Sequence, residues 1–368
     1  MKKIKIAFIK YAGCASGGTE KFLQTIAANL NKEQFDVDYF YCDATPYIGW
    51  QFNHPDTQQD RVDYLMKNNV NLIKFNVEAK DVTTPTHEWV NTNFWDVFQE
   101  SKYDLIQIAR AGHKEYPFYH IKNTPIIDSI WIEAGSDNQK NIASVFIPSN
   151  NLATKWKRSG GDMNKVIKIA EPMEEKEIQK ENLRNELKLE DKFIFGFHQR
   201  TQDEIYSKVP LLAYSKIQGD ETAFILLGGS KLYYDQAKEL NLKNFYQLKF
   251  SNSKYVEKFL NTLNVFTHGR KDGETFGVAI VEAMRNSLPI ISHRSKMNNG
   301  HIETIGSGGR VLRSTFMYSR EMRKLQKNYK YYKFRSRRSR EIFLSDYEKS
   351  RIMSVIENVY KKSIGYFN

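Results

Sequence analysis

The sequence predicts a protein of two α/β domains, each built around a doubly wound, mostly parallel sheet. Two observations lead to this prediction. The chain of 368 residues is too long for one typical hydrophobic core. Short apolar runs of strand length alternate with amphipathic stretches of helical period, and this alternation stops and begins again near the middle of the chain.

The first half opens with a strand, a glycine-rich turn and a helix. The run IKIAFI (4–9) has the length and apolar character of a buried strand, and GCASGGTE (13–20) follows it as the turn. The helix KFLQTIAANL (21–30) gathers its apolar side chains on one face. Further strands are predicted at 35–41, 104–109, 125–128 and 144–149.

A second domain is predicted after Pro172. The stretch 174–192 is charged and weakly apolar, which is typical of a boundary between domains. Strands are then expected at 193–197, 222–228, 245–250, 265–269 and 289–292, with helices near 208–218, 231–240, 254–263 and 276–286. We therefore expect an N-terminal domain over 1–170, a second domain over 171–345, and a C-terminal helix over 346–368 that packs back towards the first domain.

Composition restricts the class of protein. Apolar residues make up 40% of the chain and charged residues 27%, a balance that suits packed cores and argues against general disorder. Cys14 and Cys42 are the two cysteines, so we expect a reducing, cytoplasmic compartment rather than a disulfide framework. Lysines interrupt the apolar start of the chain, and no run of about 18 apolar residues occurs, so neither a signal peptide nor a transmembrane helix is predicted.

The formal net charge of +12 predicts anionic partners. Much of this charge lies between Arg320 and Arg340, where ten Lys or Arg residues face one acid, Glu321, with Tyr and Phe interleaved. Three explanations stay open. The segment is a solvated helix face, which we prefer, a peripheral contact with an anionic membrane, or a nucleic-acid-binding surface.

The segment VFTHGRKDGETFGVAIVEAMRNSLPIIS (265–292) carries the strongest chemical signal. A strand ends in a glycine-containing loop and a helix begins at about Phe276, so the free N–H groups and partial positive charge of a helix N-terminus become available to a phosphate. Gly277 would let the backbone approach a diphosphate closely. Glu274, just before the helix, and Glu282, eight residues later, can accept hydrogen bonds from sugar or ribose hydroxyls. We interpret the segment as a nucleotide-sugar site.

This segment resembles the Glu-x7-Glu signature of glycosyltransferase family 4. The residues that fall on the pattern are Glu274, Phe276, Gly277, Glu282, Ala283, Met284 and Pro289. The resemblance implies the GT-B architecture, with two Rossmann-like domains facing a central cleft, and a retaining, metal-independent hexosyltransferase. It also implies that Glu274 contacts the transferred sugar and Glu282 the nucleotide ribose. The amides that would hold the diphosphate are those of Thr275, Phe276, Gly277 and Val278.

The resemblance extends to other positions with less specificity. Gly17 and Gly18 match the family's glycine pair after the first strand, whose amides reach the donor phosphates. Arg200 matches the arginine that opens the donor site, where a guanidinium would neutralise diphosphate charge. The family often carries a lysine five residues later, but Ile205 stands there, and whether Lys208 takes over the catalytic role of that lysine stays open.

Candidates for the acceptor and sugar pocket are less sharply defined. Many relatives carry a histidine after the strand that matches 125–135, and this sequence lacks it. His113 is the best histidine candidate, and Arg110 and Glu115 beside it are candidates to face the acceptor. A structural histidine is the explanation of His113 that we prefer. In MNNGHIETIG (297–306) the pocket candidates are Asn299, Gly300 and His301.

No metal and no cofactor is predicted, and a nucleoside diphosphate sugar is the expected co-substrate. Asp36 and Asp38 fit an Asp-x-Asp metal pattern, but the alternation in FDVDYFY favours two acids on the solvent side of a strand. The expected acceptor is a glycan or a lipid-linked molecule in polysaccharide synthesis. Two alternatives stay open: a nucleotide-sugar epimerase or phosphorylase of the same fold, and a nucleic-acid-binding protein that uses the basic segment 320–340.

Overall fold

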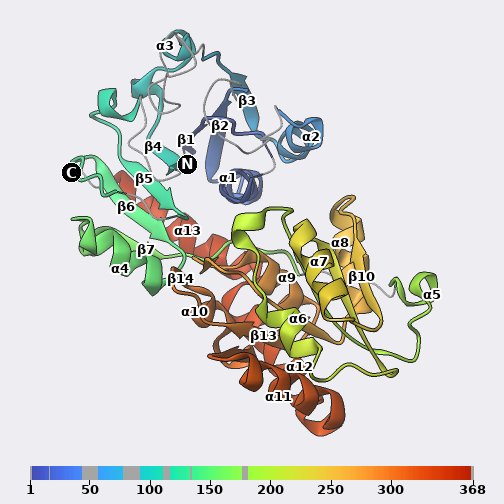
Figure 1. Cartoon of the computed structure of the whole chain (residues 1–368). Coiled ribbons are helices and arrows are strands. Elements are labelled where there is room, and N and C mark those ends of the chain that lie inside the picture. Colours follow the sequence, from blue (N-terminus) through green and yellow to red (C-terminus); the bar gives the residue numbers. More distant parts are fainter. Residues whose placement is uncertain are drawn as a thin grey trace. The chain divides into compact units, whose positions relative to one another are not determined.

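The computed structural model describes residues 2–15, 17–43, 57–77, 92–110, 117–132, 135–175 and 181–365. The chain divides into two compact units, one formed by Met1–Pro172 with Lys349–Asn368 and the other by Met173–Glu348. Each unit is an α/β fold around a parallel sheet (Figure 1). The predicted fold class, two Rossmann-like α/β domains, is confirmed.

The first unit contains a sheet of seven parallel strands in the order β3-β2-β1-β4-β5-β6-β7. The strands are β1 (Ile4–Lys10), β2 (Phe35–Tyr41), β3 (Asn71–Lys74), β4 (Leu105–Arg110), β5 (Ile126–Ile130), β6 (Ile142–Ile147) and β7 (Val166–Lys168). The order runs outward in both directions from β1 and β4, as in Rossmann folds. The sequence did not predict β3 and β7, because these short edge strands are partly exposed and lack a long apolar run.

Helices from both ends of the sequence cover this sheet. They are α1 (Gly18–Asn29), α2 (Gln59–Lys67), α3 (Phe94–Val97), α4 (Asn150–Arg158) and α13 (Lys349–Ile364). Helix α13, at the red end of the chain in Figure 1, packs against β4 and β6 of the first unit. The hydroxyl of Tyr360 donates to Oε1 of Gln107 at 2.7 Å, and both side chains are fully buried. The last helix is therefore anchored to the central strands by a buried polar contact.

The second unit repeats the same strand order around six parallel strands, β10-β9-β8-β11-β13-β15. The strands are β8 (Phe193–Gln199), β9 (Thr222–Gly228), β10 (Phe245–Leu248), β11 (Val265–Thr267), β13 (Ile290–His293) and β15 (Gly309–Leu312). A small parallel pair, β12 (Gly273–Glu274) with β14 (Asn298–Asn299), lies outside this sheet. The helices are α5 (Arg184–Leu187), α6 (Val209–Tyr214), α7 (Lys231–Glu239), α8 (Ser253–Thr262), α9 (Val278–Arg285), α10 (His301–Ile305), α11 (Thr315–Lys327) and α12 (Tyr329–Asp346).

The prediction that two acids of β2 face solvent is right for Asp36 and wrong for Asp38. The side chain of Asp36 is 55% exposed, whereas Asp38 is 4% exposed. Asp38 accepts hydrogen bonds from the Tyr103 hydroxyl and from Asn71 Nδ2, both at 2.8 Å, and its Oδ2 lies 3.2 Å from Lys5 Nζ. These partners compensate the buried charge. In the described part of the chain, no group of three His, Cys, Asp or Glu side chains is arranged to hold a metal ion.

Two further features of the sequence can be placed on the fold. Cys14 and Cys42 are both buried, and burial raises the pKa of the Cys14 thiol to about 12. Over the described ranges, no helix combines the length and the apolar character that crossing a bilayer requires.

The Tyr360 contact yields a stability prediction. Tyr360→Phe keeps the ring, which packs near Phe35 and Phe146 with centroids 6.3 Å away in each case, but leaves the buried Gln107 oxygen without its donor. An unsatisfied buried acceptor costs about 1–3 kcal/mol, so we expect the free energy of unfolding to fall by that amount. Urea unfolding measures the change.

Tyr329→Phe is the matched control, since Tyr329 is 69% exposed and we expect its hydroxyl to contribute less than about 0.5 kcal/mol. Equal stabilities of the two variants would contradict the anchoring role of Tyr360.

Candidate functional site

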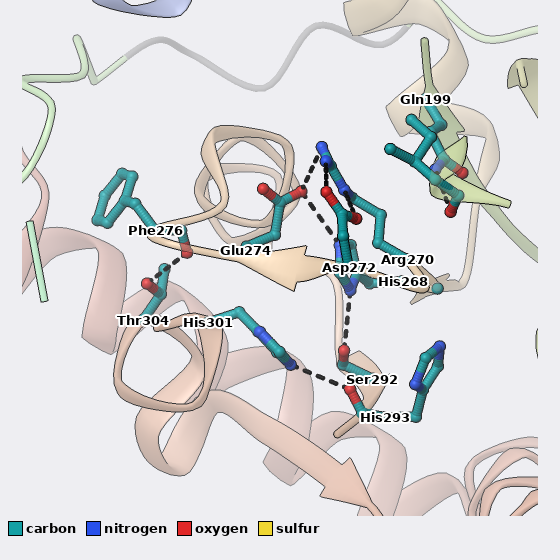
Figure 2. A network of polar contacts seen from close by, with 12 residues as sticks. Gln199, His268, Arg270, Asp272, Glu274, Phe276, Ser292, His293, His301 and Thr304 are labelled. Atoms are coloured by element: carbon teal, nitrogen blue, oxygen red, sulfur yellow. Dashed lines mark hydrogen bonds and ion pairs between the residues drawn. The ribbon is translucent and has the colours of Figure 1, made fainter. Parts of the chain in front are cut away.

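The topology of the second unit places the site. The strand order reverses between β8 and β11, because β9 and β10 extend to one side and β13 and β15 to the other. Open parallel sheets bind ligands beyond the carboxyl ends of the strands at such a reversal. Strand β8 ends at Gln199, and β11 ends just before His268. Figure 2 shows both residues around the loop that carries Glu274.

The backbone of this loop is fixed by a glycine and by the segment 298–300. Gly273 has φ +70°, and a Cβ atom at this position would lie 1.8 Å from the carbonyl oxygen of Asn298, so only glycine fits. The close approach lets β12 pair with β14, which sets Glu274 opposite Asn299. The amide of Gly300 then donates to the Glu274 carbonyl at 2.8 Å. These contacts fix the backbone of Glu274 and therefore the position of its Cβ atom.

The carboxylate of Glu274 is ionised although most of it is removed from water. Its side chain is 19% exposed, and its Oε1 lies 3.4 Å from His268 Nε2 and 3.4 Å from Arg270 Nη1 (Figure 2). Burial alone would raise the pKa of Glu274, but the hydrogen bond from His268 and the charge of Arg270 outweigh it and hold the pKa below its usual value. Glu274 is therefore a fixed anionic acceptor at neutral pH.

Two neighbours of Glu274 are themselves held in place. Nδ1 of His268 lies 2.8 Å from Ser292 Oγ at the end of β13, so the opposite ring nitrogen faces Glu274. Arg270 donates through Nε to Asp272 Oδ1 at 2.9 Å and through Nη2 to Oδ2. None of these four supporting residues was predicted from the sequence. The signal that could have indicated them is their position at or shortly after the carboxyl ends of the predicted strands, which meet at one edge of a parallel sheet.

Arg200 belongs to the same electrostatic environment. It follows β8, and its pKa is lowered by desolvation and by the Arg270 guanidinium but raised by the charges of Glu274 and Asp272. An arginine keeps its proton in proteins, so the charge of Arg200 is unchanged. The shifts show that Arg200 lies close to Arg270, Glu274 and Asp272. The loops after β8 and β11 thus bring two guanidinium groups and two carboxylates to the same end of the sheet.

The N-terminus of α9 lies next to Glu274. Gly277, the residue that precedes the helix, has φ +103°, a left-handed conformation that favours glycine, and none of the described side chains caps this end. The carbonyl of Phe276 accepts a hydrogen bond of 2.7 Å from Thr304 Oγ1, which fixes the turn between Thr275 and Val278 (Figure 2). In the first helical turn the amides of Ile280 and Val281 donate to the Gly277 carbonyl, so the amides that precede Ile280 and the partial positive charge of the helix N-terminus lie beside the carboxylate.

Glu282 lies on α9 and reaches the end of β8. Its side chain is 29% exposed, and its Oε2 lies 3.1 Å from Nε2 of His198, close but without forming a hydrogen bond. The His198 ring stands edge-on to Phe266 and Phe259, with centroid distances of 5.8 and 6.4 Å. The side chain of Glu282 therefore lies beside β8, whereas Glu274 belongs to the segment that follows β11.

His301, a predicted pocket residue, is fully buried at the start of α10. Its Nε2 donates to the carbonyl of His293 at 3.0 Å, and among the described residues its Nδ1 has no hydrogen-bond partner. Burial and the ring of His268, whose centroid is 5.5 Å away, lower the pKa of His301 to about 4. The imidazole is therefore neutral at physiological pH, with Nδ1 as a hydrogen-bond acceptor.

Other predicted residues of the nucleotide site and of the sugar pocket make local structural contacts. Lys208 precedes α6, its side chain is exposed, and its carbonyl accepts from Gln236 at 3.0 Å. Asn299 turns its amide back on its own loop, where Nδ2 donates to the Ser295 carbonyl at 2.8 Å. In the first unit, Gly17 is the N-cap of α1 and Gly18 is its first residue, with open space where a Cβ atom would be.

The predicted acceptor residue Arg110 is buried at the end of β4. Its Nε donates to Oδ2 of Asp128 at 2.7 Å, and its Nη1 donates to Oδ2 of Asp137 at 3.0 Å. The guanidinium charge is thus paired within the first unit by two carboxylates, and it joins β4 to β5. His113 and Glu115, the other acceptor candidates, lie outside the described residues.

The low pKa of His301 predicts a pH-dependent stability. Because the folded-state pKa of about 4 lies below the ordinary value of 6.5, the unfolded chain binds more protons between these two values. The free energy of unfolding should therefore fall with decreasing pH, by up to about 1.4 kcal/mol per pH unit from this residue. His301→Gln keeps an N–H group for the His293 carbonyl but does not titrate, so this part of the slope should disappear.

Guanidinium unfolding of both proteins at several pH values between 4 and 7 measures the difference in slope. Parallel pH profiles of the wild type and the variant would contradict the assignment.

Comparison with known proteins gives a family match over part of the chain and a likeness of fold over nearly all of it. The model of the family "Glycosyl transferases group 1" matches residues 179–340. The sequence has no significant match among curated proteins. Solved structures resemble the whole chain: HepE of Anabaena in complex with UDP has a TM-score of 0.74 at 16% identity and covers 98% of this chain and 100% of its own.

Two other solved structures also resemble the whole chain. A glycosyltransferase from Rickettsia africae has a TM-score of 0.75 at 14% identity and covers 99% of both chains. Sucrose-phosphate synthase from Thermosynechococcus elongatus has a TM-score of 0.71 at 13% identity and covers 99% of this chain and 100% of its own. At these identities the likeness shows a shared fold. The sequence match to the model "Glycosyl transferases group 1" covers residues 179–340, which make up most of the second unit.

Proposed function

We propose that the chain is a retaining glycosyltransferase that moves a sugar from a nucleoside diphosphate sugar to a hydroxyl acceptor in glycan or polysaccharide synthesis. One observation carries the proposal: an ionised Glu274 lies beside the N-terminus of α9, eight residues before Glu282. A carboxylate accepts hydrogen bonds from sugar hydroxyls, and free backbone amides bind phosphate. The site therefore has adjacent groups for both parts of a sugar diphosphate.

Each half of the donor has a proposed partner. Glu274 binds hydroxyls of the transferred sugar, and the amides from Thr275 to Val278 bind the diphosphate. Glu282 binds the ribose, which agrees with its partial exposure and with its position near the end of β8 rather than beside Glu274. The buried His301 helps to fix the position of Glu274 in the proposed sugar pocket, because its ring packs against His268 and His268 contacts Glu274.

Charge balance supports a reaction without a metal ion. A nucleoside diphosphate brings negative charge to a site that already contains Glu274 and Asp272. Arg270 is already paired with Asp272 and Glu274, so Arg200 and the helix N-terminus are the proposed partners of the diphosphate, and a guanidinium group binds phosphate oxygens in pairs of hydrogen bonds. We therefore propose metal-independent transfer, which should persist when a chelator is added.

The proposed chemical step is a front-side substitution at the anomeric carbon. The bond from this carbon to the diphosphate oxygen breaks while the bond to the acceptor oxygen forms on the same face. The acceptor proton passes to the departing phosphate oxygen, so no covalent sugar–enzyme intermediate is involved. The task of the protein is then to stabilise charge on the leaving group, where preorganised cations and amides lower the barrier most.

A nucleotide-binding experiment tests the donor site. Thermal shifts are measured with UDP-, GDP-, ADP- and dTDP-sugars, and slow release of free sugar is followed in parallel. A uridine donor is the first to test, because HepE was crystallised with UDP and with UDP-glucose. At a hundredfold excess over Kd, a bound nucleotide stabilises the fold by about 2.7 kcal/mol. We expect one base to do so, and Glu282→Ala to weaken its binding by about tenfold or more, since a lost hydrogen bond to a charged group costs about 1.5–3 kcal/mol.

Glu190→Ala is the matched control, because Glu190 is exposed and precedes β8 at the amino end of that strand, away from the proposed site. Its nucleotide response should equal that of the wild type. The donor site as proposed would be wrong if no nucleotide stabilised the protein, or if Glu282→Ala responded like Glu190→Ala.

The stereochemical outcome tests the retaining step. With the donor identified, proton NMR of the hydrolysis or transfer reaction reports the configuration of the first product before it equilibrates. We expect the released or transferred sugar to keep the anomeric configuration of the donor, and Glu274→Gln to lower the rate by about a hundredfold or more, as loss of a transition-state contact does. Initial formation of the opposite anomer would overturn the proposed mechanism.

A further inference from the structure

Helices α11 and α12 present an unusual combination of exposed groups. The two helices pack against each other in the second unit (Figure 1). Seven of their cationic side chains are exposed, and we call them the basic surface: Arg320, Arg323, Lys324, Lys327, Lys330, Lys333 and Arg337. The single acid between residues 320 and 340 is Glu321, which is buried and accepts a hydrogen bond of 2.6 Å from the Tyr331 hydroxyl, and its one negative charge stands against ten Lys and Arg residues in that range.

Several cations of the basic surface lie over aromatic rings. Lys324 Nζ is 3.8 Å from the ring centroid of Tyr331, and Lys333 Nζ is 5.4 Å from that of Tyr329. An aromatic face attracts a cation but carries no net charge, so it leaves the positive potential of the surface intact. Lys327 pairs with Glu221 at 3.0 Å and Arg337 pairs with Glu341 at 3.6 Å, yet these side chains are largely exposed and such pairs are weak. The basic surface thus retains a strong attraction for anions.

Exposed apolar side chains accompany these charges. They are Phe316 (63% exposed), Met317 (42%), Phe334 (49%) and Leu344 (41%), with Tyr329 at 69%. On α12, Lys330, Phe334 and Arg337 follow one another at the spacing of a single helix face. Phosphate binding alone does not require exposed Phe, Met or Leu. A lipid bilayer does use them, because they enter the boundary between headgroups and acyl chains while Lys and Arg remain at the anionic headgroups.

We propose that the basic surface of α11 and α12 docks the protein onto anionic phospholipid membranes. The surface matches such a bilayer in charge and in its apolar component, and each Lys or Arg near an anionic leaflet adds to the attraction. The apolar side chains distinguish a membrane from a nucleic acid, whose contacts are dominated by phosphates. This inference does not rest on the proposed sugar transfer, because it concerns a different surface and is tested by binding alone.

Vesicle co-sedimentation of the full chain tests the proposal. Vesicles of phosphatidylcholine alone are compared with vesicles that also contain phosphatidylglycerol, at low and at high salt. We expect binding to the anionic vesicles only, with strong weakening at high salt. The triple variant K330E/K333E/R337E should bind anionic vesicles at least about tenfold more weakly, given the contribution of each basic residue near the membrane. F334S should weaken the binding that persists at high salt.

The control is K238E/K243E/K249E, which changes the net charge by the same amount at exposed lysines outside the basic surface. It should bind like the wild type, and circular dichroism confirms that both triple variants are folded. Three results would overturn the proposal: equal binding to neutral and anionic vesicles, equal losses in the two triple variants, or binding of a labelled oligonucleotide in preference to anionic vesicles.

Discussion

The second unit is organised around a carboxylate that must stay ionised while most of it is shielded from water. Desolvation works against the charge of Glu274, and two cationic or donor groups at 3.4 Å overcome it. Those groups depend on others in turn: His268 on Ser292, and Arg270 on Asp272. Removing one support leaves a buried charge under-compensated, which costs more than the contact itself contributes. Each side chain of this network therefore depends on the others for its position.

Sheet topology explains why these residues meet. His268 follows β11 and Ser292 ends β13, and the two strands are neighbours in parallel register, with Thr267 opposite Ile291. Carboxyl ends of parallel strands lie at the same edge, so loops that are distant in sequence supply one site. A second device is local. Gly273 and Gly277 adopt backbone conformations that other residues avoid, and they turn Glu274 and the start of α9 towards each other.

The sequence allowed the architecture and the centre of the site to be predicted, because both depend on local patterns. Apolar runs identified the long central strands. The spacing of Glu274 and Glu282 around a glycine-rich helix start predicted a donor site there, and this assignment stays a prediction. The supporting residues could not be predicted in the same way, since the partnership of His268 with Ser292 depends on which strands are adjacent. Asp38 shows the opposite error. Alternation suggested solvent, but β2 is buried on both faces from Val37 to Phe40, and Asp38 lies among hydrogen-bond donors.

The most direct test of the account separates the two glutamates by calorimetric titration with a nucleoside diphosphate and with its sugar derivative. If Glu274 binds the sugar, Glu274→Gln should bind the plain nucleotide as the wild type does but lose the extra affinity that the sugar provides. Glu282→Gln should instead weaken binding of both ligands equally. Loss of both ligands in Glu274→Gln, or unchanged sugar-dependent affinity in that variant, would contradict the assignment of Glu274 to the transferred sugar.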